Sequence, residues 1–465
     1  MSGLRYRFRN WLRSRLRSPF GSTLQALGGV FLVVFLSGCA TVEPTGDPPT
    51  EPETPCQGLF CQVARCGAGQ DTRLRGTVTV PSGRDPLAKA VVYVPESGQL
   101  TPLREELSCE LCRDPIVGRA VAFTYTGLDG RFELRGVPSG DSIPLVVQKG
   151  RFRRMVRVRV PSCQTTELTV EQTRLPRSRS EGDLPKLAVA AGDHDAIECV
   201  LRQIGIADAE IATPDKPAAV HLYDNQKPGT ESLPGQPLLS SLLTDLSRLV
   251  RYQMLFLNCS GTAHSQALLT DPLVRRNLVE FLRRGGRLYA TDWSYDFVQQ
   301  LPELSPYVCF EDDKDCSVTT PHGFHAAVAR GGTGDPLTAA VTLQAAGLRE
   351  FLARLPVPID ASKVPITELL PGWVQIAQTA QDPLRFPSTV YLTGVSLGKL
   401  RPLTVAFEYP PQAGCGRVLF SSYHTRERAV PRPFPTYCPL GNMLPQEHIL
   451  EYLLFELADC LGSIG

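Results

Sequence analysis

Three short polar stretches hold the residues with the clearest capacity for chemistry. They are NCSG at 258–261, TDWS at 291–294 and SSYHTRE at 421–427. Each follows an apolar run of the kind that forms a buried strand. Ligands of open α/β sheets bind beyond the carboxyl ends of the strands, so we expect the three stretches to line one site. The candidate ligand-binding residues are Asn258, Asp292, Trp293 and His424.

Two catalytic arrangements are open to these residues. Asp292 could act as a general base that, together with His424, activates water for the hydrolysis or isomerisation of a sugar derivative. Cys259 could instead be a nucleophile with His264 or His424 as its base. Both arrangements require that the strand ends meet in the fold.

The residues around these stretches predict the elements that position them. An apolar run at 187–191 predicts a buried strand, and a helix with an apolar face follows at 196–204. The run at 252–257 predicts a second strand. A helix opened by Asp271 as its N-cap follows, and 287–291 predicts a third strand. Strand, helix and strand at this spacing indicate parallel pairing through right-handed crossovers.

The fold class predicted for 187–465 is α/β and flavodoxin-like, with a mostly parallel sheet. The pieces 256–261, 288–294 and 414–424 also resemble class I glutamine amidotransferase-like domains, including their trehalose-utilisation-like branch. In that family one strand end helps to form an oxyanion hole, the next carries a nucleophile elbow, and a late strand delivers a histidine. The resemblance implies the same fold.

The nucleophile of that family is absent at the matching position. An elbow needs small residues two positions either side of the nucleophile. Ala290 and Ser294 satisfy this, but the central residue is Asp292, and the family's His-x-Glu pair is off register after His424. A carboxylate has no proton for a histidine to remove. We therefore predict no catalytic residues; if the chain were an enzyme, Asp292, His424 and Cys259 would carry the reaction.

Residues 56–175 predict a small antiparallel β-sandwich, because short Val-rich runs alternate with period two. The runs are 73–80, 90–95, 120–126, 130–137, 143–148 and 154–160. The segment TGLDGRFELRGVPSGDSIPLVVQKG resembles the carboxypeptidase regulatory-like domain, a transthyretin-like sandwich, with Asp129-Gly130 as its hairpin turn and Phe132 and Leu134 on one face. The resemblance implies a non-catalytic spacer or binding module. A polar linker is predicted at 176–186.

The N-terminal segment predicts export and lipidation. Six arginines and no acidic residue accompany an apolar run at 27–36, as is typical of an export signal. That run is shorter than the roughly 20 residues of a spanning helix. Leu36-Ser37-Gly38-Cys39 resembles the bacterial lipobox, which implies a signal peptide at 1–38 and a lipidated Cys39. A Pro-rich tether would follow within 39–55, and Ala40 after the cysteine implies sorting to the outer membrane.

The remaining cysteines are expected to be mostly disulfide-bonded in an exported chain. The disulfide candidates are Cys309, Cys316, Cys415 and Cys438. Cys309 and Cys316 flank a short acidic loop and are expected to pair with each other. Cys259 is expected to bridge to Cys199 or Cys460, which would remove it as a nucleophile.

Charge narrows the range of partners. Without the arginine-rich leader the chain carries 42 basic and 47 acidic residues and has no basic stripe with interleaved aromatics, so we expect no nucleic acid. The cysteines at 56–66 have a spacing that could suit zinc, but no histidine lies near them in the sequence. We expect neither a metal nor a cofactor.

These features together predict a cell-envelope lipoprotein of the outer membrane. Its expected role is non-catalytic binding or assembly, as a subunit of an envelope or surface machine. Its expected partners are the membrane, through the lipid anchor, and an envelope protein or glycan. The alternative is an envelope hydrolase that acts on glycan or amide substrates through the α/β cleft.

Overall fold

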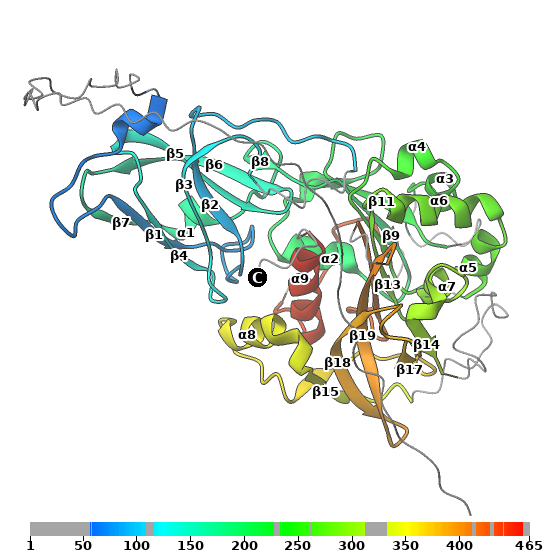
Figure 1. Ribbon diagram of the computed structural model, residues 1–465. Coiled ribbons are helices and arrows are strands. Elements are labelled where there is room, and N and C mark those ends of the chain that lie inside the picture. The colour runs from blue at the N-terminus through cyan, green and yellow to red at the C-terminus, as the bar shows by residue number, and fades with distance from the viewer. Residues whose placement is uncertain are drawn as a thin grey trace, which may run out of the picture. The chain divides into compact units, whose positions relative to one another are not determined.

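Short strands build the first folded part of the chain in the computed structural model (Figure 1). The structure describes residues 56, 58–107, 116–226, 233, 235–260, 262–311, 333–411, 415–427, 432–439 and 441–458. The predicted signal peptide, Cys39 and the tether lie outside these residues. Within them, no helix is both long enough and apolar enough to cross a membrane.

Two sheets form the sandwich. One has five strands in the order β3-β2-β5-β6-β8, and the other has three in the order β4-β1-β7. The strands are β1 (Arg73–Thr77), β2 (Val91–Pro95), β3 (Ala120–Tyr125), β4 (Arg131–Arg135), β5 (Gly140–Lys149), β6 (Phe152–Val160), β7 (Thr165–Glu167) and β8 (Gly182–Asp183). All neighbours pair antiparallel except β1 and β7, which pair parallel. The sandwich therefore has one parallel pair that the sequence did not predict.

The turn before β4 explains why its sequence contains glycine. Gly130 has a φ of +74°, and a Cβ at this position would lie 2.8 Å from the carbonyl oxygen of Val78. A residue with a side chain would be strained by both features. Phe132 and Leu134 then point into the core, where both are buried.

Disulfides tie the sandwich together. Cys66 bonds to Cys163, and Cys56 bonds to Cys61. All four sulfurs are thus oxidised, so the zinc spacing at 56–66 does not form a zinc site. The Cys66–Cys163 bond joins residues 97 apart in the sequence, so it removes more freedom from the unfolded chain than a short loop would.

The α/β part contains a ten-stranded mixed sheet in the order β10-β11-β9-β12-β13-β20-β19-β18-β15-β16. Its strands are β9 (Leu187–Ala191), β10 (Ile211–Ala212), β11 (Val220–Asp224), β12 (Met254–Leu257), β13 (Arg287–Thr291), β15 (Leu337–Val341), β16 (Val364–Ile366), β18 (Ser388–Ser396), β19 (Lys399–Tyr409) and β20 (Gly416–Ser421). Strands β14 (Val308–Phe310) and β17 (Ile376–Thr379) form a separate antiparallel pair.

This sheet has a parallel half and an antiparallel half. Pairing is parallel from β10 to β20, and β11-β9-β12-β13-β20 is the flavodoxin-like order 2-1-3-4-5. From β20 to β16 each neighbour pairs antiparallel. The prediction of a mostly parallel sheet is therefore wrong in extent, because β19 follows β18 through a tight turn at Leu397-Gly398, where φ is positive at both residues.

Helices cover both faces of the sheet. They are α2 (Ile197–Gln203), α3 (Ser240–Leu243), α4 (Leu246–Leu249), α5 (Thr262–Leu269), α6 (Pro272–Arg283), α7 (Asp296–Gln299), α8 (Ala346–Arg354) and α9 (Pro445–Ala458), whereas α1 (Val170–Thr173) lies on the sandwich beside β1. The N-cap of α6 is Asp271, whose side chain accepts a hydrogen bond from the amide of Leu273 at 2.8 Å, as predicted. The α3, α4 and α6 group packs with Leu255, whereas α2 and α9 pack with Phe256 on the opposite face (Figure 1).

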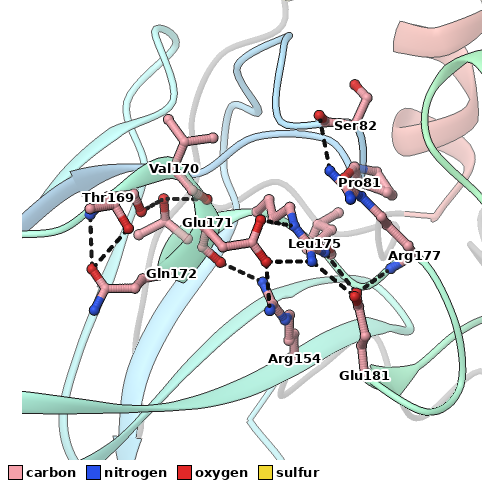
Figure 2. Close-up of polar contacts among 12 residues, drawn as sticks. Pro81, Ser82, Arg154, Thr169, Val170, Glu171, Gln172, Leu175, Arg177 and Glu181 are labelled. Atoms are coloured by element: carbon pink, nitrogen blue, oxygen red, sulfur yellow. Dashed lines mark hydrogen bonds and ion pairs between the residues drawn. The ribbon is translucent and has the colours of Figure 1, made fainter.

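The predicted linker at 176–186 is bound closely to the sandwich. Arg174, whose side chain is 3% exposed, forms ion pairs with Glu181 at 2.7 Å and with Glu171 at 2.6 Å. The amide of Arg177 donates to Glu181 at 2.8 Å, and Figure 2 shows these carboxylates at the centre of the network. Strand β8 extends the five-stranded sheet from within the same segment.

The sandwich and the α/β sheet share a hydrophobic core. One cluster of buried residues contains the sandwich core, α2 and α9. Phe152 of β6 packs against Phe455 of α9 with ring centroids 5.2 Å apart. Gly150 lies so close to the end of α9 that a Cβ would be 2.2 Å from the carbonyl oxygen of Ala458. The two parts therefore contact each other through packed side chains as well as through the chain.

Candidate functional site

The polar stretches meet at the carboxyl ends of β9, β12, β13 and β20. These four strands are neighbours in the parallel half, and the strand order reverses between β9 and β12, where α/β folds form their binding crevice. Asn258, Asp292 and His424 are all brought to this edge and are all buried. The sequence therefore predicted which residues converge.

Asp292 occupies the position that the amidotransferase-like resemblance assigns to the nucleophile. Its φ is +41°, a left-handed backbone that Asp and Asn tolerate better than most residues. Its side chain is fully buried. One carboxylate oxygen accepts a hydrogen bond from the amide of Val374 at 2.7 Å, and the other accepts from the Cys259 thiol at 3.6 Å. The carboxylate is thus held from two directions by the protein.

Burial governs the protonation of Asp292. Loss of solvent raises its pKa to about 6, and the charge of His424 and the hydrogen bond from Val374 act in the opposite direction. A general base that works on a substrate must also reach the proton that it removes. The carboxylate has no exposed surface from which to do this.

Cys259 is a free, buried thiol. The expected bridge to Cys199 or Cys460 is wrong, because Cys199 of α2 bonds to Cys438 instead. Burial, followed by the charge of Asp292, raises the pKa of the Cys259 thiol well above its ordinary value. The thiol therefore stays protonated and donates to Asp292, which is the opposite of what a nucleophile requires.

His424 faces Asp292 at the end of β20. Its Nδ1 lies 2.8 Å from the carbonyl oxygen of Thr425, so Nδ1 carries a proton and donates it there. Its Nε2 lies 4.0 Å from a carboxylate oxygen of Asp292 and has no hydrogen-bond partner among the described residues. The side chain of His264 lies outside those described, so its role as an alternative base stays a prediction.

Asp195, just after β9, connects the strand ends and was missed in the sequence. One of its oxygens accepts a hydrogen bond from the Thr291 hydroxyl at 2.6 Å. The other accepts from the amide of Thr425 at 3.0 Å and from its hydroxyl. The Thr291 hydroxyl in turn accepts from the amide of Cys259 at 2.9 Å. The GDHDA stretch that follows the strand at 187–191 was the available signal.

Asn258 is also used inside the protein. Its amide nitrogen lies 3.2 Å from both the carbonyl of Asp195 and a carboxylate oxygen of Glu198. Glu198 accepts a hydrogen bond from the Tyr437 hydroxyl at 2.6 Å. Tyr437 directly precedes Cys438, which is disulfide-bonded to Cys199. The segment around Tyr437 is thereby fixed over this side of the site.

A second segment covers Asp292 from above the sheet edge. It runs between β16 and β17 and provides the Val374 amide already described. The indole nitrogen of Trp293 donates to the carbonyl of Gly372 at 3.2 Å in the same segment. Trp293 is partly buried by this contact, and Tyr295 is fully buried. Trp293 is therefore engaged by the covering segment.

The disulfide candidates that the structure describes are all oxidised. Cys438 is bonded to Cys199, and Cys309 and Cys415 are each disulfide-bonded. Cys316 lies outside the described residues, so its pairing with Cys309 stays a prediction.

An open cleft lies elsewhere, between the segment at 102–107 and the α/β part. Its volume is 860 Å³. Its charged lining residues are Arg104, Glu105, Glu106, Arg151, Arg179, Asp183, Lys186, Arg251 and Arg284. The segment is tied to the α/β part by Gln253, whose amide donates to the carbonyl of Glu105 at 3.1 Å. Basic residues outnumber acidic ones in this lining.

Comparisons with known proteins give distant structural likenesses. Neither a protein-family model nor a curated protein matches this sequence. The cytoplasmic protein STM3548 from Salmonella typhimurium is 14% identical over 59% of this chain and 98% of its own, with a TM-score of 0.31. A putative ThuA-like protein from Bacteroides uniformis is 10% identical over 58% of this chain and 89% of its own, with a TM-score of 0.27. A cohesin–X-dockerin complex from Acetivibrio cellulolyticus covers 32% of this chain with a TM-score of 0.17.

The chain thus has a distant structural similarity to a ThuA-like protein over somewhat more than half of its length. What the residues do is decided by the contacts of this chain.

Proposed function

We propose that this chain is a non-catalytic binding protein of the cell envelope, anchored to the outer membrane through a lipidated Cys39. The lipobox at 36–39 and the proline-rich stretch after it support the anchor. Disulfides at Cys66–Cys163 and Cys199–Cys438 agree with an oxidising compartment. The sandwich, by its resemblance to carboxypeptidase regulatory-like domains, would serve as a spacer or binding module.

The closure of the Asp292 site is the observation that carries the non-catalytic role. Asp292 and His424 have no exposed side-chain surface, and a backbone amide and a thiol occupy the Asp292 carboxylate. A substrate would have to displace the segment that contains Gly372 and Val374. The same contacts are what a structural role requires, because buried polar groups are stable only when they are paired.

The open cleft at 102–107 is the better binding surface. Asp183 in its lining is already neutralised by Arg153 at 2.7 Å. Burial is the main cause that lowers the pKa of Lys186, and the charge of Arg251 adds to it while that of Glu105 opposes it, so Lys186 and Arg251 repel each other in this lining. An envelope partner that carries carboxylate or phosphate groups would relieve this repulsion.

Binding is tested with purified lipopolysaccharide and peptidoglycan sacculi as probes. Arg251→Glu should weaken binding about 10-fold or more and reduce its salt dependence, because it reverses a charge inside the cleft. Arg248→Glu is the matched control, since Arg248 lies on the same segment and is absent from the lining. Equal binding by the wild type and both variants would place the recognition surface elsewhere.

The anchor has its own test. Mass spectrometry of the protein from bacterial envelopes should find Cys39 as the acylated N-terminus. Cys39→Ser should release the chain from the membrane fraction. Retention of the leader in the wild-type protein would overturn the anchor without affecting the cleft.

An envelope hydrolase is the second candidate, and one observation favours it. His424 has an Nε2 without a hydrogen-bond partner in the described part of the chain, 4.0 Å from a carboxylate held in a left-handed turn. Purified wild type and Asp292→Ala should both leave glycan and amide polymers intact. Turnover that Asp292→Ala abolishes would replace the non-catalytic proposal with this one.

A further inference from the structure

A second cluster of ionisable side chains lies between the sandwich and the last helix. Asp85 comes from the loop between β1 and β2, and His448 and Glu451 are one turn apart on α9. One potential ligand atom from each residue lies within 4.8 Å of the others. The ring Nδ1 of His448 is 3.1 Å from a carboxylate oxygen of Glu451. Distant parts of the chain thus bring an imidazole and two carboxylates together.

Both carboxylates are buried and incompletely satisfied. Asp85 is 2% exposed and Glu451 is fully buried. Each has one buried oxygen that receives no N–H or O–H from another described residue, and the two carboxyl groups can hydrogen-bond to each other only when one of them is protonated. A buried acceptor without a partner costs free energy comparable to a lost hydrogen bond, and two such oxygens at one place are unusual in a folded protein. The cluster therefore has unused capacity to bind a ligand.

Neighbouring cations do not complete the cluster. Arg84 lies nearest along the chain, but its guanidinium donates to the carbonyl of Gln203 at 3.0 Å and contacts the sulfur of Met443. Burial, followed by the charge of Glu451, raises the pKa of Asp85 to about 7. Ionising both carboxyl groups is thus unfavourable unless a positive charge enters between them.

We propose that Asp85, His448 and Glu451 bind a divalent cation of the zinc class. Imidazole with carboxylate oxygens is a donor set that suits Zn²⁺, and three protein ligands leave a fourth position for water. Ligand atoms of a tetrahedral zinc site lie roughly 3.4 Å apart, so the observed separations need only a small contraction of the side chains. A hard cation such as Ca²⁺ would demand more oxygen ligands than these residues offer.

The cation would join the sandwich to the α/β part. Asp85 belongs to the sandwich, and α9 packs against the sheet through Ile449 and Leu453. The same boundary already has a hydrogen bond from the amide of Ser82 to the carbonyl of Ile204 at 2.8 Å. Zinc bound here would therefore stabilise the contact between the two parts, and this role is independent of the binding function proposed above.

Zinc binding is tested on the full chain in detergent. After dialysis against a chelator, calorimetric titration with Zn²⁺ should give one site per chain, and the unfolding temperature should rise with zinc. Glu451→Gln and His448→Gln should each weaken binding about 100-fold or more and abolish the zinc-dependent rise. Glu456→Gln is the matched control, because Glu456 is a partly exposed carboxylate on the same helix.

Two further measurements keep the outcome clear. Glu451→Asp retains a carboxylate and should retain measurable binding, which separates loss of a ligand from loss of the fold. Co²⁺ in place of zinc should give the visible absorption of a four-coordinate site in the wild type and not in His448→Gln. Equal zinc affinity in wild type and Glu451→Gln would overturn the proposal. No zinc binding, with Asp85→Asn as stable as the wild type, would assign the cluster to a proton shared between the two carboxyl groups.

Discussion

Two buried carboxylate–histidine clusters in this chain have similar residues and opposite surroundings. Asp292 beside His424 receives a backbone amide and a thiol, and a disulfide-bonded segment covers the same sheet edge. Asp85 and Glu451, beside His448, each have one buried oxygen that receives no N–H or O–H from another described residue. Both lie where separate parts of the chain meet. In the first cluster the protein satisfies the carboxylate of Asp292, although not Nε2 of His424, whereas in the second the carboxylates themselves have unsatisfied oxygens.

Residue type alone therefore does not identify a functional site. Asp292 lies at the fold's usual binding edge, yet its hydrogen bonds are used to hold strand ends and a covering segment together. The Asp85 cluster lies away from that edge, yet it has the unsatisfied acceptors that a cation would use. Whether the buried carboxylate oxygens are satisfied is the better indicator of a site that could bind a ligand.

The largest expected loss of stability concerns the Cys199–Cys438 disulfide. It lies near Asn258, Asp292 and His424, which form the cluster at the strand ends (the strand-end cluster). Replacing Cys199 and Cys438 together by alanine should lower the free energy of unfolding by about 5 kcal/mol, because the bond joins residues 239 apart. Replacing Cys56 and Cys61, only 5 apart, should cost about 2 kcal/mol. Denaturant unfolding under oxidising conditions measures both. Equal losses of stability in the two double variants would show that the stabilisation by a disulfide does not depend on the length of the loop that it closes.

The next effect concerns the carboxylate that links the strands. Asp195→Ala should cost about 3 kcal/mol, because the Thr291 hydroxyl and the amide and hydroxyl of Thr425 would lose a buried, charged acceptor. Asp193→Ala is the control and should change stability by less than about 0.5 kcal/mol, since its side chain is 44% exposed. Chemical denaturation at neutral pH compares them. A small loss for Asp195→Ala would contradict its role as a hub.

Replacing Asp292 should have the opposite effect to replacing Asp195: it should raise the stability of the fold. Its pKa is raised to about 6 in the folded chain, so the native state holds a proton that the unfolded state loses, and stability falls as pH rises from about 4 to 6. Asn can adopt the same left-handed φ and can still accept from Val374. Asp292→Asn should therefore raise the free energy of unfolding at pH 7.5 by about 2 kcal/mol.

The pH profile separates this explanation from others. In Asp292→Asn the decline in stability between pH 4 and 6 should be reduced, whereas Asp193→Asn should keep the wild-type profile. If Asp292→Asn were less stable than the wild type at pH 7.5, the ion pair of Asp292 with His424 would outweigh the cost of burying the carboxylate.

Local rules predicted the elements that position the strand-end cluster. The helix of α6 begins after Asp271 because a side-chain oxygen caps its first amides, and β9 and β13 have the predicted bounds because fully buried parallel strands are continuous apolar runs. The antiparallel half was missed, since Gly394 interrupts the run that forms β18 and Pro402 interrupts the run that forms β19, and both residue types argue against a strand. The convergence of Asn258, Asp292 and His424 followed from strand direction.

The state of each cluster could not be predicted from the same rules. Val374 lies far from Asp292 in the sequence, and only the folded chain shows that its amide covers the carboxylate. Asp85 and His448 belong to opposite ends of the folded sequence, so no spacing rule relates them. Hydrogen-bond satisfaction is a long-range property, because it depends on segments that meet only through tertiary packing.

The smallest effect concerns Glu181, a carboxylate that is paired but only partly buried. Hydrogen bonds from Arg174 lower the pKa of Glu181 to about 2, while its side chain keeps 29% of its surface exposed. Glu181→Gln should cost about 1 kcal/mol at pH 7, because partial solvent exposure screens the pair. Since the folded pKa is lowered, this stabilisation is complete above about pH 5 and is lost as pH falls toward 2.

Glu171 is the matched control for that carboxylate. It pairs with the same Arg174 but is 63% exposed, so Glu171→Gln should cost less at every pH. Thermal unfolding of both variants between pH 2 and 7 measures the difference. A larger loss of stability for Glu171→Gln than for Glu181→Gln would mean that solvent exposure does not control the strength of these ion pairs. The contrast between the satisfied carboxylate of Asp292 and the unsatisfied ones of Asp85 and Glu451 would then need another cause.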